Sequence, residues 1–130
     1  MPSHNIGQTL QTIDLIPMQS VTATGNGTGV DVTQFTGEIA VLLACKATAG
    51  TTPTLDVKLQ DSDTLGGTYA DISGATFTQV TDAGSSAAVL LKIAVKVDSA
   101  KNFIRAVRTA GGTSPAFMTT CVAVGLKQVR

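Results

Sequence analysis

Apolar and polar residues alternate in short runs along most of the chain, which is the pattern of β-strands with one buried face. In residues 55–60, aliphatic side chains alternate with Asp, Lys and Gln. Residues 89–97 extend the same alternation over a longer stretch, with two lysines and an alanine on the other face. Residues 39–46 are apolar on one face and partly apolar on the other, which predicts a central strand.

The last part of the chain has two further runs, residues 103–109 and 116–124, on either side of the turn-rich residues 111–115. A loop of this length predicts an antiparallel hairpin. No window shows the 3.6-residue periodicity of a long helix. The sequence therefore predicts an all-β fold, an antiparallel β-sandwich or β-barrel of about eight strands, and alternation alone fits either architecture. Weaker runs complete the count, at residues 21–24, 30–35, 69–72 and 75–80.

The first twenty residues carry isolated apolar side chains without clean alternation. Pro17 argues against a central strand there, because proline cannot donate to a sheet ladder. We therefore expect residues 1–20 to form an extended N-terminal arm ahead of a single β domain, residues 21–130. Such an arm typically needs a partner surface to become ordered. Its apolar residues are candidate subunit-interface positions: Ile6, Leu10, Ile13, Leu15 and Ile16.

Composition narrows the function. Charged residues make up only 14% of the 130 residues, against about 25% in typical domains, and the net charge is zero. A weakly charged surface lacks the self-repulsion that keeps proteins apart, so it suits a packed assembly. The nine basic residues form no cluster, which argues against nucleic acid. The longest apolar stretch, residues 39–45, is too short to span a membrane. No secretory signal is evident, so we expect synthesis in the cytoplasm.

The chain is poor in groups that perform chemistry. His4 is the single histidine and lies in the expected arm, where it could not be held against a nucleophile. Cys45 and Cys121 are expected to be buried thiols, and with one distant histidine they form no zinc motif. Residues 61–67 resemble the start of a calcium loop, but Leu65 occupies a ligand position. We therefore expect no enzyme activity, no cofactor and no metal site.

Arg105 and Arg108 fall on opposite faces of an otherwise apolar run. One of them is expected to meet a carboxylate or a neighbouring subunit, so both join the candidate subunit-interface residues. The alternative is that both point to solvent at sheet edges.

Several turn and strand segments between about residues 15 and 125 form a recognisable set: residues 21–31 leading to 37–41, then 55–63, 74–77, 103–106 and 112–117. As a set, these segments resemble small structural proteins of tailed bacteriophages. The resemblance implies a virion component from the head-gene region, most plausibly a decoration, or cement, protein.

Under this resemblance the protein would sit on the outer surface of the capsid, bridge subunits of the major capsid protein and stabilise the shell by binding only its assembled form. It would form a homo-oligomer, a trimer or a dimer, around local symmetry axes. Two alternatives stay open. One is a component of the phage tail, neck or baseplate, and the other is a carbohydrate-binding or adhesin-type β-sandwich module, for which the chain offers few aromatic residues.

Overall fold

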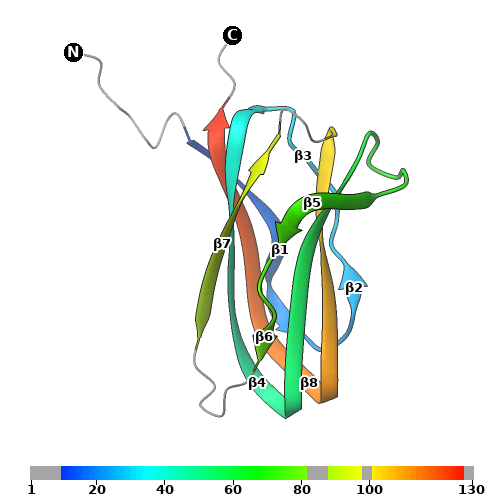
Figure 1. Cartoon of the computed structure of the whole chain (residues 1–130), viewed down its shortest axis with the longest axis vertical. Helices are drawn as coiled ribbons and strands as arrows, with labels where there is room; N and C mark the ends of the chain where they lie inside the picture. The colour runs from blue at the N-terminus through cyan, green and yellow to red at the C-terminus, as the bar shows by residue number, and fades with distance from the viewer. Residues whose placement is uncertain (1–9, 82–87, 98–100, 128–130) are drawn as a thin grey trace, which may run out of the picture.

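The computed structural model describes residues 10–81, 88–97 and 101–127, and it confirms the all-β class (Figure 1). Eight strands form one antiparallel sheet, and the described residues contain no helix. Among the described strands, no pairing closes the sheet into a barrel. The strands are β1 (Leu10–Val21), β2 (Gly25–Asn26), β3 (Val30–Asp31), β4 (Phe35–Ser62), β5 (Ala70–Thr76), β6 (Val80–Thr81), β7 (Val89–Lys96) and β8 (Phe103–Lys127).

The two longest strands fold the sheet over on itself. β4 has 28 residues and β8 has 25, and they pair along almost their whole length. Both reverse direction near their middles, at the lower end of the molecule in Figure 1. At the bends the backbone takes left-handed φ angles at Thr52 in β4 (45°) and Gly112 in β8 (93°). One continuous sheet thereby becomes a two-layered sandwich.

We call the two halves the first and second layers. The first layer runs in the order β7, residues 35–49 of β4, residues 116–127 of β8, and β1. In the second layer, β5 and β6 pair with residues 54–61 of β4, and β2 and β3 pair with residues 103–108 of β8. The two layers face each other across the core (Figure 1).

The expected C-terminal hairpin is wrong. Residues 103–109 and 116–124 are not paired neighbours but the two halves of β8, and each half pairs with the matching half of β4. Likewise the predicted strands 39–46 and 55–60 are the two halves of β4. The glycine-rich segment at 111–115 does turn the chain, but it turns β8 alongside the bend of β4 and carries it from one layer to the other.

Residues 10–20 also differ from the expected arm, because they lie in β1 and pair with β8 at the edge of the first layer. The register of this ladder shifts between Asp14 and Ile16 and again between Ile16 and Gln19. A bulge of this kind places consecutive side chains on one face. Leu15 and Ile16 are accordingly both buried, so clean alternation is lost. Pro17 is tolerated because it lies in this irregular part of an edge strand. Residues 1–9 lie outside the described residues.

The core lies between the layers and follows the alternation of the strands. Val41 and Leu43 enter it from the first half of β4, and Leu55, Val57 and Leu59 from the second half. β8 contributes residues from both of its halves, namely Ile104, Ala106, Phe117, Cys121 and Ala123. Their neighbours along each strand therefore form two outer faces, one on each layer.

Candidate interaction surfaces

The outer face of the second layer is a polar network centred on Arg105. Its guanidinium donates two hydrogen bonds to Oε1 of Gln60, at 2.9 Å from Nε and 2.7 Å from Nη2. Its Cζ also lies 4.2 Å from the centre of the Tyr69 ring, which is a cation–π geometry. The Tyr69 hydroxyl in turn donates to the Leu65 carbonyl at 2.8 Å. Arg105 therefore meets an amide and a ring rather than the expected carboxylate.

The network continues across β4 to β5. Nε2 of Gln60 donates to Asp71 at 2.8 Å, and the Lys58 ammonium lies 3.0 Å from the other oxygen of that carboxylate. The hydrogen bond from Gln60, followed by that from Lys58, holds the pKa of Asp71 below its ordinary value. Because these groups satisfy one another in water-accessible positions, this face needs no partner to remain stable.

Arg108 points the other way, which confirms the predicted placement of the two arginines on opposite faces. It lies two residues beyond the buried Ala106 and lines a cavity of about 290 Å³ between β1 and β2. Its Nε is buried and has no hydrogen-bond partner among the described residues. The residue opposite Arg108 on β2 is Gly25. A side chain at Gly25 would crowd the guanidinium, because a Cβ there would lie 3.1 Å from Nη2 of Arg108.

The remaining candidate interface residues lie in β1 or before it. Leu15 and Ile16 are fully buried in the protein's own core, which leaves them no surface for a second subunit. Ile13 is half-buried and packs against the same core. Leu10 is half-buried on the outer side of the first layer, and Ile6 lies outside the described residues.

In contrast to the second layer, the first layer has an apolar outer face. Four of the five large hydrophobic side chains that the described residues expose belong to it, the fifth being Leu65. Met18 and Leu90 are the most exposed of them, at 73% and 71%. Half-buried aliphatic residues fill the space between them. We call this surface the apolar outer face; its apolar members are Leu10, Met18, Ala40, Leu42, Ala44, Leu90, Ala94, Met118, Val122, Val124 and Leu126.

A shallow groove of about 350 Å³ crosses one end of the apolar outer face. Met18 and Met118 border it on one side and Leu90 on the other, with Ala44 and Thr120 between them. The exposed Lys46, opposite Met118, also lines the groove. Contiguous apolar patches of this kind are uncommon on monomeric proteins and usually mark interaction sites. The sequence held a signal for this face, because Leu42 made the outward side of its strand apolar.

The described residues hold no group of three or more His, Cys, Asp or Glu side chains that could bind a metal ion. They also contain no helix long and apolar enough to cross a membrane. What distinguishes the molecule is instead the contrast between its two outer faces.

Cys45 and Cys121 are both buried and unpaired, which confirms the expected buried thiols. They lie on the inward side of the first layer, in β4 and β8. Burial raises the pKa of Cys121 to about 12 and raises that of Cys45 as well. Since the thiolate is the reactive species, both cysteines should be inert in the folded protein.

We expect a chromogenic thiol reagent at pH 8 to label neither cysteine of the folded protein within an hour, and to label both within minutes in strong denaturant. The reason is that a pKa near 12 leaves only about one thiol in 10,000 ionised at pH 8, and burial blocks access besides. The variant Cys45→Ala should halve the denatured signal and leave the native one unchanged. Rapid labelling of the native protein, or no free thiol in denaturant, would contradict this.

Comparison with known proteins gives a fold likeness and no family. No protein-family model matches the chain, and no curated protein matches it. Among solved structures, the chain resembles a Bacillus endospore appendage protein, described as belonging to a novel family of disulfide-linked pili. The two share 15% sequence identity with a TM-score of 0.51, over 93% of this chain and 90% of that one. At this identity the likeness shows a common fold.

Proposed function

We propose that this protein is a non-enzymatic structural subunit that acts by non-covalent assembly, as a virion component that decorates the outside of a phage capsid. The observation that carries the proposal is the apolar outer face, which exposes Met18, Leu90, Met118 and Leu126 to water in the isolated chain. Removing apolar surface from water drives association at about 25 cal/mol per Å². The polar groups of the opposite face hydrogen-bond to one another. We therefore expect the protein to bind its partner through the apolar outer face.

The capsid location rests on the resemblance of the strand and turn segments to phage head proteins. In that role the protein would bridge subunits of the major capsid protein and stabilise the expanded shell by binding it alone. Repetition over the lattice would supply avidity, so each contact could be weak. The low charge of the chain and the pairing of β4 with β8 along almost their whole length support a clamping module.

A second candidate, a subunit of an extracellular filament, is favoured by the fold likeness to the endospore appendage protein. The pili of that family are disulfide-linked. Here Cys45 and Cys121 are buried, so a filament of this protein would be held by non-covalent contacts and would survive reducing agents. Ring formation by the isolated subunit would instead favour a tail, neck or baseplate component.

The test adds purified protein to phage heads that lack it, followed by cryo-electron microscopy. We expect density at regular positions over the outer shell. Leu42→Asp, on the apolar outer face, should abolish that density, whereas Val107→Asp on the outer face of the second layer should not. The two positions are matched, since both are half-buried and each lies opposite a lysine on the adjacent strand.

Three results would overturn the capsid role. Density confined to one vertex or to the tail would move the protein to the neck or tail. Filaments formed without heads, and unaffected by reductant, would establish the second candidate. Heads that remain bare at high protein concentration would exclude the decoration of that shell.

A further inference from the structure

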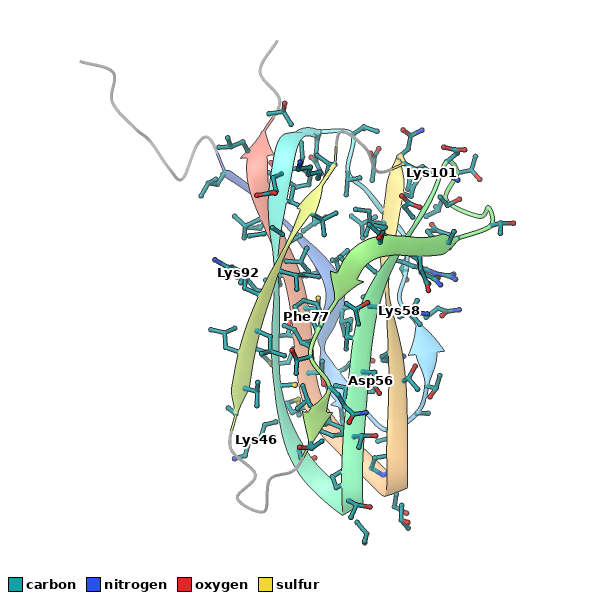
Figure 2. The ribbon with its side chains drawn as sticks, viewed as in Figure 1. Lys46, Asp56, Lys58, Phe77, Lys92 and Lys101 are labelled. Carbon is teal, nitrogen blue, oxygen red and sulfur yellow. The ribbon has the colours of Figure 1, made fainter. Side chains whose placement is uncertain are left out.

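The partner of the apolar outer face can be inferred from the arrangement of its charges. Directly opposed residues of antiparallel strands point to the same side of a sheet. The ladders align Lys92 of β7 with Leu42 of β4, Leu42 with Val122 of β8, and Val122 with Asp14 of β1. One row across the first layer therefore carries a cation at one rim, an apolar centre and an anion at the other rim. Figure 2 shows the Lys92 side chain extending away from the sandwich.

Both rim charges are exposed, and neither forms an ion pair within the part of the chain that the structure describes. Asp14 also borders the cavity of Arg108, but no ion pair joins the two side chains. Around the central row, the surface between the rims is built from small or aliphatic residues, and the exposed Glu38 and Lys46 of β4 lie at its two ends. On one side of the central row lie Ala94, Ala40, Val124 and Thr12, and on the other Leu90, Ala44 and Thr120.

We propose that the apolar outer face binds a second copy of this chain, face to face, about a two-fold axis parallel to the strands. Such an axis exchanges the two rims while keeping each row opposite itself. Lys92 would then meet the partner subunit's Asp14 at both rims. Leu42 would pack on the partner's Val122, and Leu90 would approach the partner's Met18 across the groove.

The rim charges favour this axis over one that crosses the strands at the central row. A two-fold axis lying across the strands through that row would place each strand on its own copy, so Lys92 would face the partner's Lys92 and Asp14 the partner's Asp14. Like charges in contact across an interface are strongly disfavoured. The parallel axis converts both rim repulsions into attractions without moving an apolar residue out of the contact. It also sets Lys46 and Glu38 near their own copies, but both lie at the ends of the face, where their exposed side chains can extend past the contact into water.

The face is large enough for a weak but specific dimer. Four strands spaced about 4.8 Å apart, over about eight residues of 3.4 Å rise, cover roughly 500 Å² on each copy. Two copies would bury about 1,000 Å² in total, which is close to the lower limit of specific interfaces. We therefore expect a dimer with a micromolar dissociation constant, which the lattice of a larger assembly would reinforce.

The decisive experiment mixes two charge variants. Lys92→Asp alone sets Asp against the partner's Asp14 in its homodimer, and Asp14→Lys alone sets Lys against the partner's Lys92. Each variant should dimerise at least tenfold more weakly than the wild type in sedimentation equilibrium. Mixed in equal amounts, they should form a heterodimer within about threefold of wild-type affinity, because both rims regain opposite charges.

Thr109→Lys serves as a control, since it adds a charge at an exposed position of the second layer and should leave the affinity unchanged. Thermal unfolding of every variant checks that each remains folded, in particular Asp14→Lys, which lies near Arg108. A wild type that is monomeric up to millimolar concentration would overturn the proposal. So would single variants that dimerise normally, or weakened variants that the mixture does not restore.

This inference rests on the proposal that the protein acts by assembly, but the two can fail separately. A wild-type dimer that leaves phage heads bare would keep the two-fold pairing and remove the capsid role. A monomer that decorates heads at regular positions would do the reverse, and would assign the apolar outer face to the capsid protein.

Discussion

Replacing Gly112 by alanine is expected to lower the free energy of unfolding by about 3 kcal/mol. Gly112 has a φ of 93° at the bend of β8, a backbone conformation that residues other than glycine rarely adopt. A Cβ at this position would lie 2.5 Å from the Thr52 carbonyl oxygen and 2.9 Å from that of Thr51. Both contacts are with backbone, which cannot move aside without opening the bend of β4. The loss should appear as a lower midpoint in chemical denaturation.

Two other glycines separate the causes of this loss. Gly74 has a φ of 77° but nothing within 4 Å of a built Cβ, so Gly74→Ala should show the conformational part alone, about 1 kcal/mol. Gly66 has an open surrounding and no left-handed φ, so Gly66→Ala should be neutral within about 0.5 kcal/mol. If Gly112→Ala were as stable as Gly66→Ala, the bends of β4 and β8 could not be packed as described.

This bend matters for function because it creates the two unlike outer faces. Without it, β4 and β8 would continue as flat strands with no second layer to cover their inward residues. With the bend, the inward side of each strand is buried, and the outward sides of the two layers carry different kinds of residue. The first layer keeps Leu42 and Val122 outside, and the second keeps Gln60 and Arg105.

The sequence predicted the fold where alternation was intact. The inward face of β7 is predicted correctly, because Val89, Leu91, Ile93 and Val95 recur at alternate positions; on the outward side, Leu90 departs from the polar pattern. Alternation also places Leu55, Val57 and Leu59 in the core. It fails for β1, because the bulge at Leu15 and Ile16 puts two consecutive residues inside and imitates an irregular arm.

Sequence reasoning also fails where the information is not local. A glycine-rich turn between two strands suits a hairpin and a bend equally well, and only the antiparallel pairing of β4 with β8 on both sides of the turn decides between them. The interaction surfaces show the same limit. Arg105 and Arg108 are correctly predicted on opposite faces, but the partners of Arg105 come from β4 and the segment before β5, far away in the chain. The charged rims of the apolar outer face lie on β1 and β7, whose alignment depends on three ladders through the two intervening strands, β4 and β8.

Two adjacent residues of β8 should separate folding from assembly. Phe117 is fully buried, opposite Val21 on β1 and Ala47 on β4. Phe117→Ala should lower the free energy of unfolding by about 3–5 kcal/mol, because it leaves a cavity between the layers. A chemical denaturation curve would show the loss directly.

Met118, the next residue, is 44% exposed and borders the groove of the apolar outer face. Met118→Ala should change the unfolding free energy by less than about 0.5 kcal/mol. It should nevertheless weaken self-association several-fold in sedimentation equilibrium, since the side chain contributes apolar area only when the face is covered. The two variants thus differ in which equilibrium they disturb. If Met118→Ala destabilised the monomer as strongly as Phe117→Ala, the outer side of the first layer would already be packed within one chain and would need no partner to cover it.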